Sequence, residues 1–186
     1  DACEHKTALW RAQCVRVTCQ QQRIAAELQR MEKECTDNKL EKPVTILVTM
    51  NYKEKWFPRY YRQKHTEHFG KRGCSWHGFM VRFYVYNPTK KKAELQAVYC
   101  DQIQLGSAKQ DGLATAALVE AFFTQLKSEP IFSDVKSVGI LSDNAKYYLG
   151  KFLLLAMFNV VSSCGWVLLY FLHTESCDGK CPLDAH

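Results

Sequence analysis

The sequence predicts an α/β domain with a mixed five-stranded sheet flanked by helices and preceded by an N-terminal helix. Apolar, β-branched segments follow one another early in the chain, which indicates consecutive antiparallel strands. Two later apolar segments alternate with helix-like segments, which indicates parallel strands joined by helices. The expected strands are residues 44–50, 76–86, 94–103, 135–141 and 166–171.

The N-terminal region is predicted to be a helix over residues 7–33. It is rich in Ala, Gln, Glu, Arg and Leu and contains neither Gly nor Pro. Three cysteines lie on or near its apolar stripe, and we interpret them as small packed side chains rather than metal ligands. Residues 1–42 therefore form a helical segment and linker, and the main domain spans residues 43–186. The stripe consists of Leu9, Val17, Ile24, Leu28 and Met31.

The first three strands should form a meander, with a long connection over residues 51–74 and a turn at residues 87–90. A helix should then begin at Asp111-Gly112 and end near Lys127, before Pro130. We expect four of its apolar residues to face inward: Leu113, Ala117, Phe122 and Leu126.

The second half of the domain should alternate strand and helix. The buried strand at residues 135–141 precedes a helix from about Tyr147, and residues 166–171 form the last strand. Residues 181–186 are typical of the first turn of another helix, so we expect the domain to continue beyond His186. This order of elements is the ribonuclease H-like order.

Residues 152–172 form an apolar segment about as long as a membrane-spanning helix. Polar residues interrupt them, and their second half is strand-like, so a buried helix, a glycine turn and a strand fit better. A membrane-associated or protein-interaction domain is the alternative that uses this segment.

The bulk composition limits the functional classes. The chain has 186 residues, a net charge of +6 and a pI of about 8.8, which is compatible with a nucleic acid or another anionic partner. Its nine cysteines are an odd number, and no secretory signal opens the sequence. We therefore expect reduced thiols and an intracellular location.

Three polar residues should meet at one edge of the predicted sheet: Asn51, Asp143 and Asp184. Asp143 and Asp184 are candidate ligands for Mg²⁺ or Mn²⁺, since hard cations prefer oxygen donors and such ions promote phosphodiester cleavage. Asn51 has no charge to offset that of a second ion, which should impair activity. The alternative is that Asp143 only caps the next helix.

Several sequence motifs resemble the catalytic core of eukaryotic DDE-type transposases, which have a retroviral-integrase-like fold. The resemblance covers residues 43–186 and implies metal-dependent cleavage and transfer of DNA strands, DNA as the partner and a nuclear location. It implies Asp143 and Asp184 as metal ligands and a catalytic position at Asn51, where the family usually has Asp. The motifs are Asn51-Tyr52-Lys53-Glu54-Lys55, Gly70-Lys71-Arg72-Gly73-Cys74-Ser75-Trp76-His77-Gly78, Ser142-Asp143-Asn144-Ala145 and Leu183-Asp184-Ala185-His186.

The connection after the first strand interleaves basic and aromatic residues, a pattern that suits phosphate neutralisation and base stacking. It could equally be a solvated loop whose aromatic residues pack under the sheet. If it alone is functional, the protein is a catalytically inactive nucleic-acid-binding module. The basic candidates are Lys53, Lys55, Arg59, Arg62, Lys64, Lys71 and Arg72.

A zinc site is disfavoured. Four residues have a loosely zinc-like spacing, and Cys74 and His77 could add a pair, but the pattern matches no standard finger. We expect ordinary loop cysteines, no small-molecule cofactor and a domain that can form homo-oligomers. The four residues are His173, Cys177, Cys181 and His186.

Overall fold

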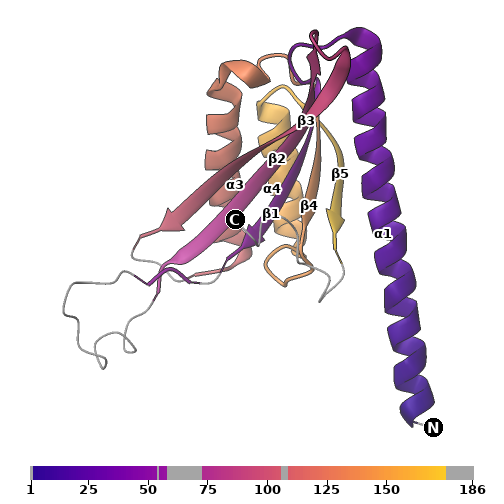
Figure 1. Cartoon of the computed structure of the whole chain (residues 1–186). Coiled ribbons are helices and arrows are strands. Elements are labelled where there is room, and N and C mark those ends of the chain that lie inside the picture. Colours follow the sequence, from indigo (N-terminus) through magenta and orange to yellow (C-terminus); the bar gives the residue numbers. More distant parts are fainter. Residues whose placement is uncertain (1, 54, 58–72, 106–108, 175–186) are drawn as a thin grey trace, which may run out of the picture.

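The computed structural model describes residues 2–53, 55–57, 73–105 and 109–174 of the chain (Figure 1). Its helices are α1 (Ala2–Asn38), α3 (Gly112–Ser128), the 3-10 turn η1 (Pro130–Phe132) and α4 (Lys151–Ser163). Its strands are β1 (Thr45–Tyr52), β2 (Ser75–Asn87), β3 (Lys92–Gln104), β4 (Ser137–Ser142) and β5 (Val167–His173).

The five strands form one mixed sheet in the order β3-β2-β1-β4-β5. β1, β2 and β3 are an antiparallel meander, whereas β4 lies parallel to β1 and β5 parallel to β4. The predicted mixed α/β sheet with an N-terminal helix is therefore confirmed at this level. Each predicted strand is present, with ends that differ by one or two residues from the expected ones.

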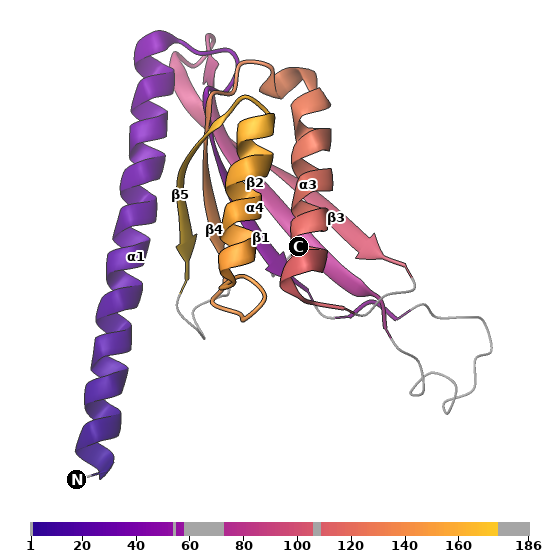
Figure 2. The ribbon, with the colours of Figure 1, turned by 180° about the vertical axis from the view of Figure 1, so that it is seen from behind.

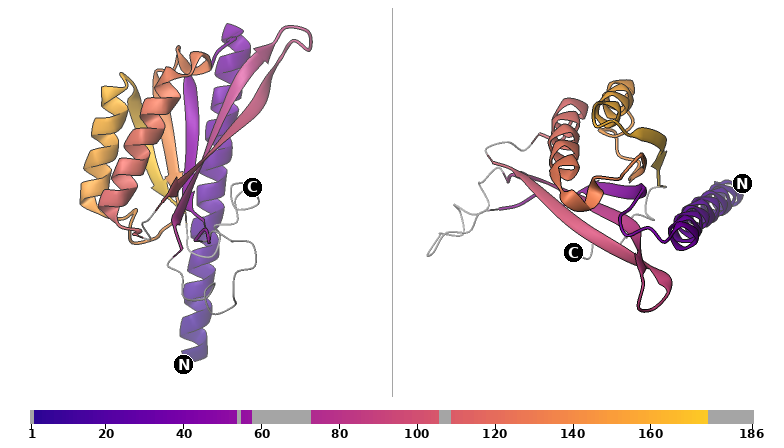
Figure 3. Two further views of the ribbon diagram at one scale, coloured as in Figure 1. Left: turned by 90° about the vertical axis from the view of Figure 1, so that its left-hand side faces the viewer. Right: turned by 90° about the horizontal axis from the view of Figure 1, so that it is seen from above.

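The sheet lies between two unequal layers, which the side view in Figure 3 separates clearly. α3 and α4 cover one face and bury most of the apolar core, to which β1 contributes Ile46, Val48 and Met50. α1 lies against the opposite face, where Met31 meets Leu47 and Leu141. Alternate residues of β1 therefore face different helices, because successive side chains of a strand point to opposite faces of the sheet.

α1 is longer than predicted, and its two halves have different environments. Met31 and Cys35 near its end are buried, whereas Leu9, Trp10 and Val15 near its beginning are exposed. Figure 1 shows the reason, because the beginning of the helix extends past the end of the sheet. The sheet therefore holds only the second half of α1.

The segment that resembled a membrane span divides as expected into α4, a turn at Gly165 and β5. Gly165 has φ of +79°, a left-handed conformation that side chains disfavour. Within the described ranges, no helix combines the length and apolarity needed to cross a bilayer.

Candidate functional site

Asn51 and Asp143 lie on neighbouring parallel strands at the same edge of the sheet. Met50 of β1 is the register partner of Ser142 of β4, and each candidate residue comes directly after one of these two. Adjacent parallel strands are about 4.8 Å apart, so the two backbones run side by side at this edge. The structure therefore brings together two of the three residues that the sequence predicted. The third, Asp184, lies outside the described residues.

Asp143 is partly exposed, and it does not cap α4. Its Oδ1 atom accepts a hydrogen bond from the backbone N–H of Ala145 at 3.1 Å, which forms a local turn. The helix begins later, with Gly150 as its N-cap residue. The capping interpretation of Asp143 is therefore wrong, because residues 145–149 form turns before α4 starts.

A hydrogen-bonded Ser–His pair, which the sequence did not reveal, stands beside Asp143. The Oγ atom of Ser142 is 2.8 Å from Nδ1 of His173 on β5, and it donates to the backbone carbonyl of Asp143 at 3.0 Å. Burial lowers the pKa of His173, while the backbone carbonyl and the carboxylate of Asp143 oppose that shift. Ser142 is only 1% exposed, so this pair ties β4 to β5 and offers no nucleophile to solvent.

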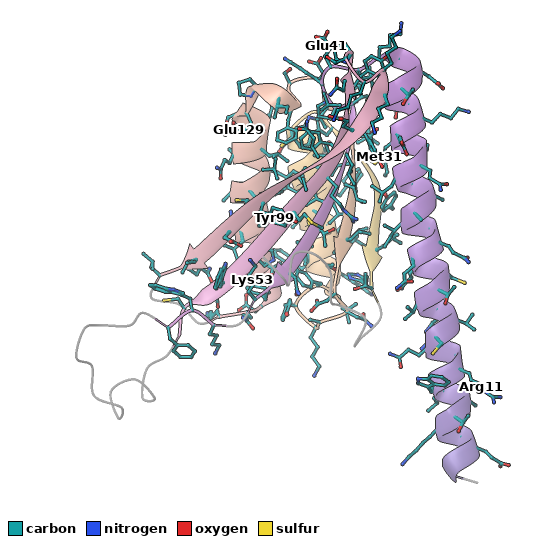
Figure 4. The ribbon with its side chains drawn as sticks, in the orientation of Figure 1. Arg11, Met31, Glu41, Lys53, Tyr99 and Glu129 are labelled. Atoms are coloured by element: carbon teal, nitrogen blue, oxygen red, sulfur yellow. The ribbon has the colours of Figure 1, made fainter. Side chains whose placement is uncertain are left out.

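Lys53, which we expected to bind nucleic acid, is held within the protein. Its Nζ atom lies 3.0 Å from Oδ1 of Asp101 on β3 and 4.9 Å from the ring centre of Trp76. Its side chain is only 11% exposed. In Figure 4 this residue lies at the lower end of the sheet, far from Glu41 at the upper end. Its charge is therefore partly neutralised close to the Asn51–Asp143 edge.

Among the other basic candidates, the structure describes only Lys55. Lys55 is exposed next to the site, and Trp56 and Cys74 form an antiparallel bridge that closes the base of the long connection. The remaining candidates lie outside the described residues: Arg59, Arg62, Lys64, Lys71 and Arg72.

A buried aromatic cluster supports this edge from the side of α3. Tyr52 meets the ring of His77 edge-on at 4.6 Å, and its hydroxyl lies 3.1 Å from that of Thr115. The Nε2 atom of His77 is 2.7 Å from the hydroxyl of Tyr148. Burial lowers the pKa of His77 to about 3, so its ring is neutral at pH 7. The cluster joins β1, β2 and α3 to the segment that follows Asp143.

Tyr147 links this cluster to the candidate carboxylate. Its ring meets Tyr52 edge-on at 4.7 Å. Burial, and next the negative charge of Asp143, raise the pKa of Tyr147 to about 12. The carboxylate of Asp143 therefore influences both the partly buried phenol of Tyr147 and the ring of His173.

The donor atoms at this edge are oxygens, namely the amide carbonyl of Asn51 and the carboxylate of Asp143. Over the part of the chain that the structure describes, no three His, Cys, Asp or Glu residues come together in a metal-binding group. Of the Cys74–His77 pair that zinc could have used, His77 is buried in the core with its Nε2 atom 2.7 Å from the hydroxyl of Tyr148. Cys177, Cys181 and His186 lie outside the described residues.

No protein-family model matches the chain, and a comparison with curated proteins finds no match either. The resemblance to DDE transposases therefore stays a prediction from its motifs.

Proposed function

We propose that the chain is a ribonuclease H-like domain derived from a DDE transposase, and that it cleaves or transfers DNA strands with the help of Mg²⁺ or Mn²⁺. The observation on which this depends is the register that puts Asn51 beside Asp143. In open α/β sheets, ligands bind at the carboxyl ends of the strands, where these residues lie.

The order of strands supports the same proposal. A β3-β2-β1-β4-β5 sheet with an antiparallel meander and two parallel strands agrees with the ribonuclease H-like order of elements. The positions of two motifs are compatible with the proposal, since Asn51 is near the end of β1 and Ser142-Asp143-Asn144 begins at the last residue of β4.

The residues at this edge fit a hard divalent cation. Asp143 would bind it through the carboxylate oxygen that does not accept the N–H of Ala145, and Asn51 would add a neutral carbonyl oxygen. Asp184 is the proposed third ligand. When bound, such a cation stabilises the charge that develops on the phosphate oxygens. With Asn51 in place of an acid, we expect slow cleavage.

Plasmid nicking tests this function directly. The full chain should convert supercoiled DNA to the nicked form with Mn²⁺ or Mg²⁺, and Asp143→Ala should abolish the conversion. Asp37→Ala is the matched control, because Asp37 is an exposed acid near the end of α1. Equal nicking by all three proteins would show that Asp143 has no part in the reaction.

A catalytically inactive DNA-binding module is the second candidate. It is favoured by the neutral side chain at Asn51, and its DNA contacts would have to come from basic residues other than Lys53, which is paired with Asp101. DNA binding that weakens as salt rises, with no nicking under either metal, would select this candidate.

A further inference from the structure

The α3–α4 layer carries several large apolar side chains that are exposed to solvent. α4 is mostly apolar, and its inner face is fully buried through Leu153, Met157 and Val161. Figure 2 shows α3 and α4 side by side at the front of the molecule. Six large apolar side chains on or next to these two helices are at least half exposed. They are Leu113, Leu149, Phe152, Leu154, Leu155 and Phe158.

These six side chains, which we call the α4 face, expose about 600 Å² of apolar surface if each contributes on the order of 100 Å². The largest apolar patch of an ordinary monomer measures about 300–600 Å². A stable protein–protein interface buries about 800 Å² from each partner, polar atoms included. The α4 face is therefore large enough to form the centre of a dimer interface.

The two phenylalanines of α4 are equally spaced on either side of Leu155, as a twofold axis at Leu155 would require. Phe152 precedes Leu155 by three residues and Phe158 follows it by three, so all three lie on neighbouring parts of one helix surface. When two copies of α4 cross antiparallel at Leu155, Phe152 of each copy meets Phe158 of the other. Aromatic pairs of this kind favour association beyond the area that they bury.

Charge does not oppose this arrangement. Lys151 is the only charged residue in α4, and it precedes Leu155 by four residues. In the antiparallel crossing it approaches Asn159 of the partner, which follows Leu155 by four, so the two lysines stay apart. Self-association is therefore compatible with the charges of the helix.

We infer that the α4 face is a homodimer interface, with a second copy of this chain as its occupant and a twofold axis passing near Leu155. The two copies meet helix layer to helix layer. The carboxyl edge of β1 and β4 stays outside the contact, because the interface involves the outer surface of the helices. This inference does not depend on the proposed DNA chemistry.

The mass of the full chain in solution, measured by sedimentation equilibrium from micromolar to millimolar concentration, tests the interface. The unmodified protein should be a dimer. Leu155→Glu and Leu155→Lys should each be monomeric, because either one places two like charges at the twofold axis. An equimolar mixture of these two variants should regain the dimer, since residue 155 then meets a residue of opposite charge.

Leu95→Glu is the matched control, because Leu95 is half exposed on β3 at the other side of the sheet. This variant should stay dimeric. A monomeric unmodified protein, a dimer that tolerates both charges at position 155, or a mixture that stays monomeric would each overturn the interface. A monomer that binds phospholipid vesicles through Leu155 would also overturn it and identify a membrane surface as the occupant.

Discussion

At the scale of single residues, Asn51 sets the strength of the proposed metal site. Asn51→Asp should tighten Mn²⁺ binding by about tenfold or more, because a full negative charge replaces a neutral oxygen next to the cation. Isothermal titration calorimetry measures this change. Asn38→Asp is the control, since it adds the same charge at the end of α1. Equal affinities for the two variants would contradict a cation site at Asn51.

His77 should make the stability of the protein depend on pH. Its pKa is about 3 in the folded protein and about 6.5 when unfolded, so below pH 6.5 the unfolded state binds the proton more readily. The stabilising contribution is complete above pH 6.5 and is lost as the pH falls towards 3. The loss from this residue should approach about 1.4 kcal/mol per pH unit.

Urea denaturation between pH 7 and pH 4 measures this effect. His77→Gln removes the titrating ring and should flatten the dependence on pH relative to the unmodified protein, although it lowers stability at pH 7. Parallel pH profiles for the two proteins would show that His77 is not the responsible group.

At the scale of elements, Gly139 sets how closely β4 and β5 approach. Its register partner is Tyr170, and a Cβ atom at position 139 would overlap the Tyr170 ring. Gly139→Ala should therefore destabilise the fold by about 1–3 kcal/mol. In the Tyr170→Ala background the same substitution should cost much less, which a double-mutant cycle measures. Additive losses would contradict the steric contact.

The two halves of α1 should differ in their effect on stability. Met31→Ala should cost about 2–4 kcal/mol of unfolding free energy, because Met31 is 3% exposed against Leu47 and Leu141. Val15→Ala should change it by less than about 0.5 kcal/mol, since Val15 is 62% exposed. Chemical denaturation compares them, and equal losses would contradict the packing described for α1.

Much of the element order was predictable because each strand has a dense apolar segment and each break has a clear signal. Asp111 is an example, since its carboxylate caps α3 through the N–H of Ala114 at 2.8 Å. The inward face of α3 was predicted less well. Leu113 and Ala117 are exposed, whereas Thr115 and Val119 are buried. α3 has apolar residues on all sides, so its periodicity does not define one face.

Thr115 is a polar residue on the buried face of α3, and its hydrogen bonds explain why it can lie there. Its hydroxyl donates to the backbone carbonyl of Asp111 at 2.7 Å and meets the hydroxyl of Tyr52. Such contacts depend on tertiary structure and leave no trace in a hydrophobic pattern.

The candidate site was predictable to the same degree as the strands that form it. Asn51 and Asp143 could be placed together because both follow the apolar core of a buried strand. The Ser142–His173 contact could not, because it depends on the β4–β5 register, which shifts between Val138 and Gly139. One residue of shift changes which side chains meet across a pair of strands.

At the scale of the whole molecule, the sheet divides the protein into two surfaces with separate proposed roles. The carboxyl edge of β1 and β4 presents oxygen donors and a partly neutralised lysine, whereas the outer side of α3 and α4 presents an apolar face. Because these surfaces involve different residues, variants at Leu155 should alter self-association without altering cation binding.

The proposed function depends on the binding of a divalent cation at the carboxyl edge of β1 and β4. Paramagnetic broadening of amide NMR signals by Mn²⁺ tests it most directly, since the effect is strongest for the residues nearest the ion. We predict that substoichiometric Mn²⁺ broadens the signals of Asn51, Ser142 and Asp143 first, and that Asp143→Ala removes this effect. Broadening centred on other residues, or unchanged in the Asp143→Ala variant, would contradict the account.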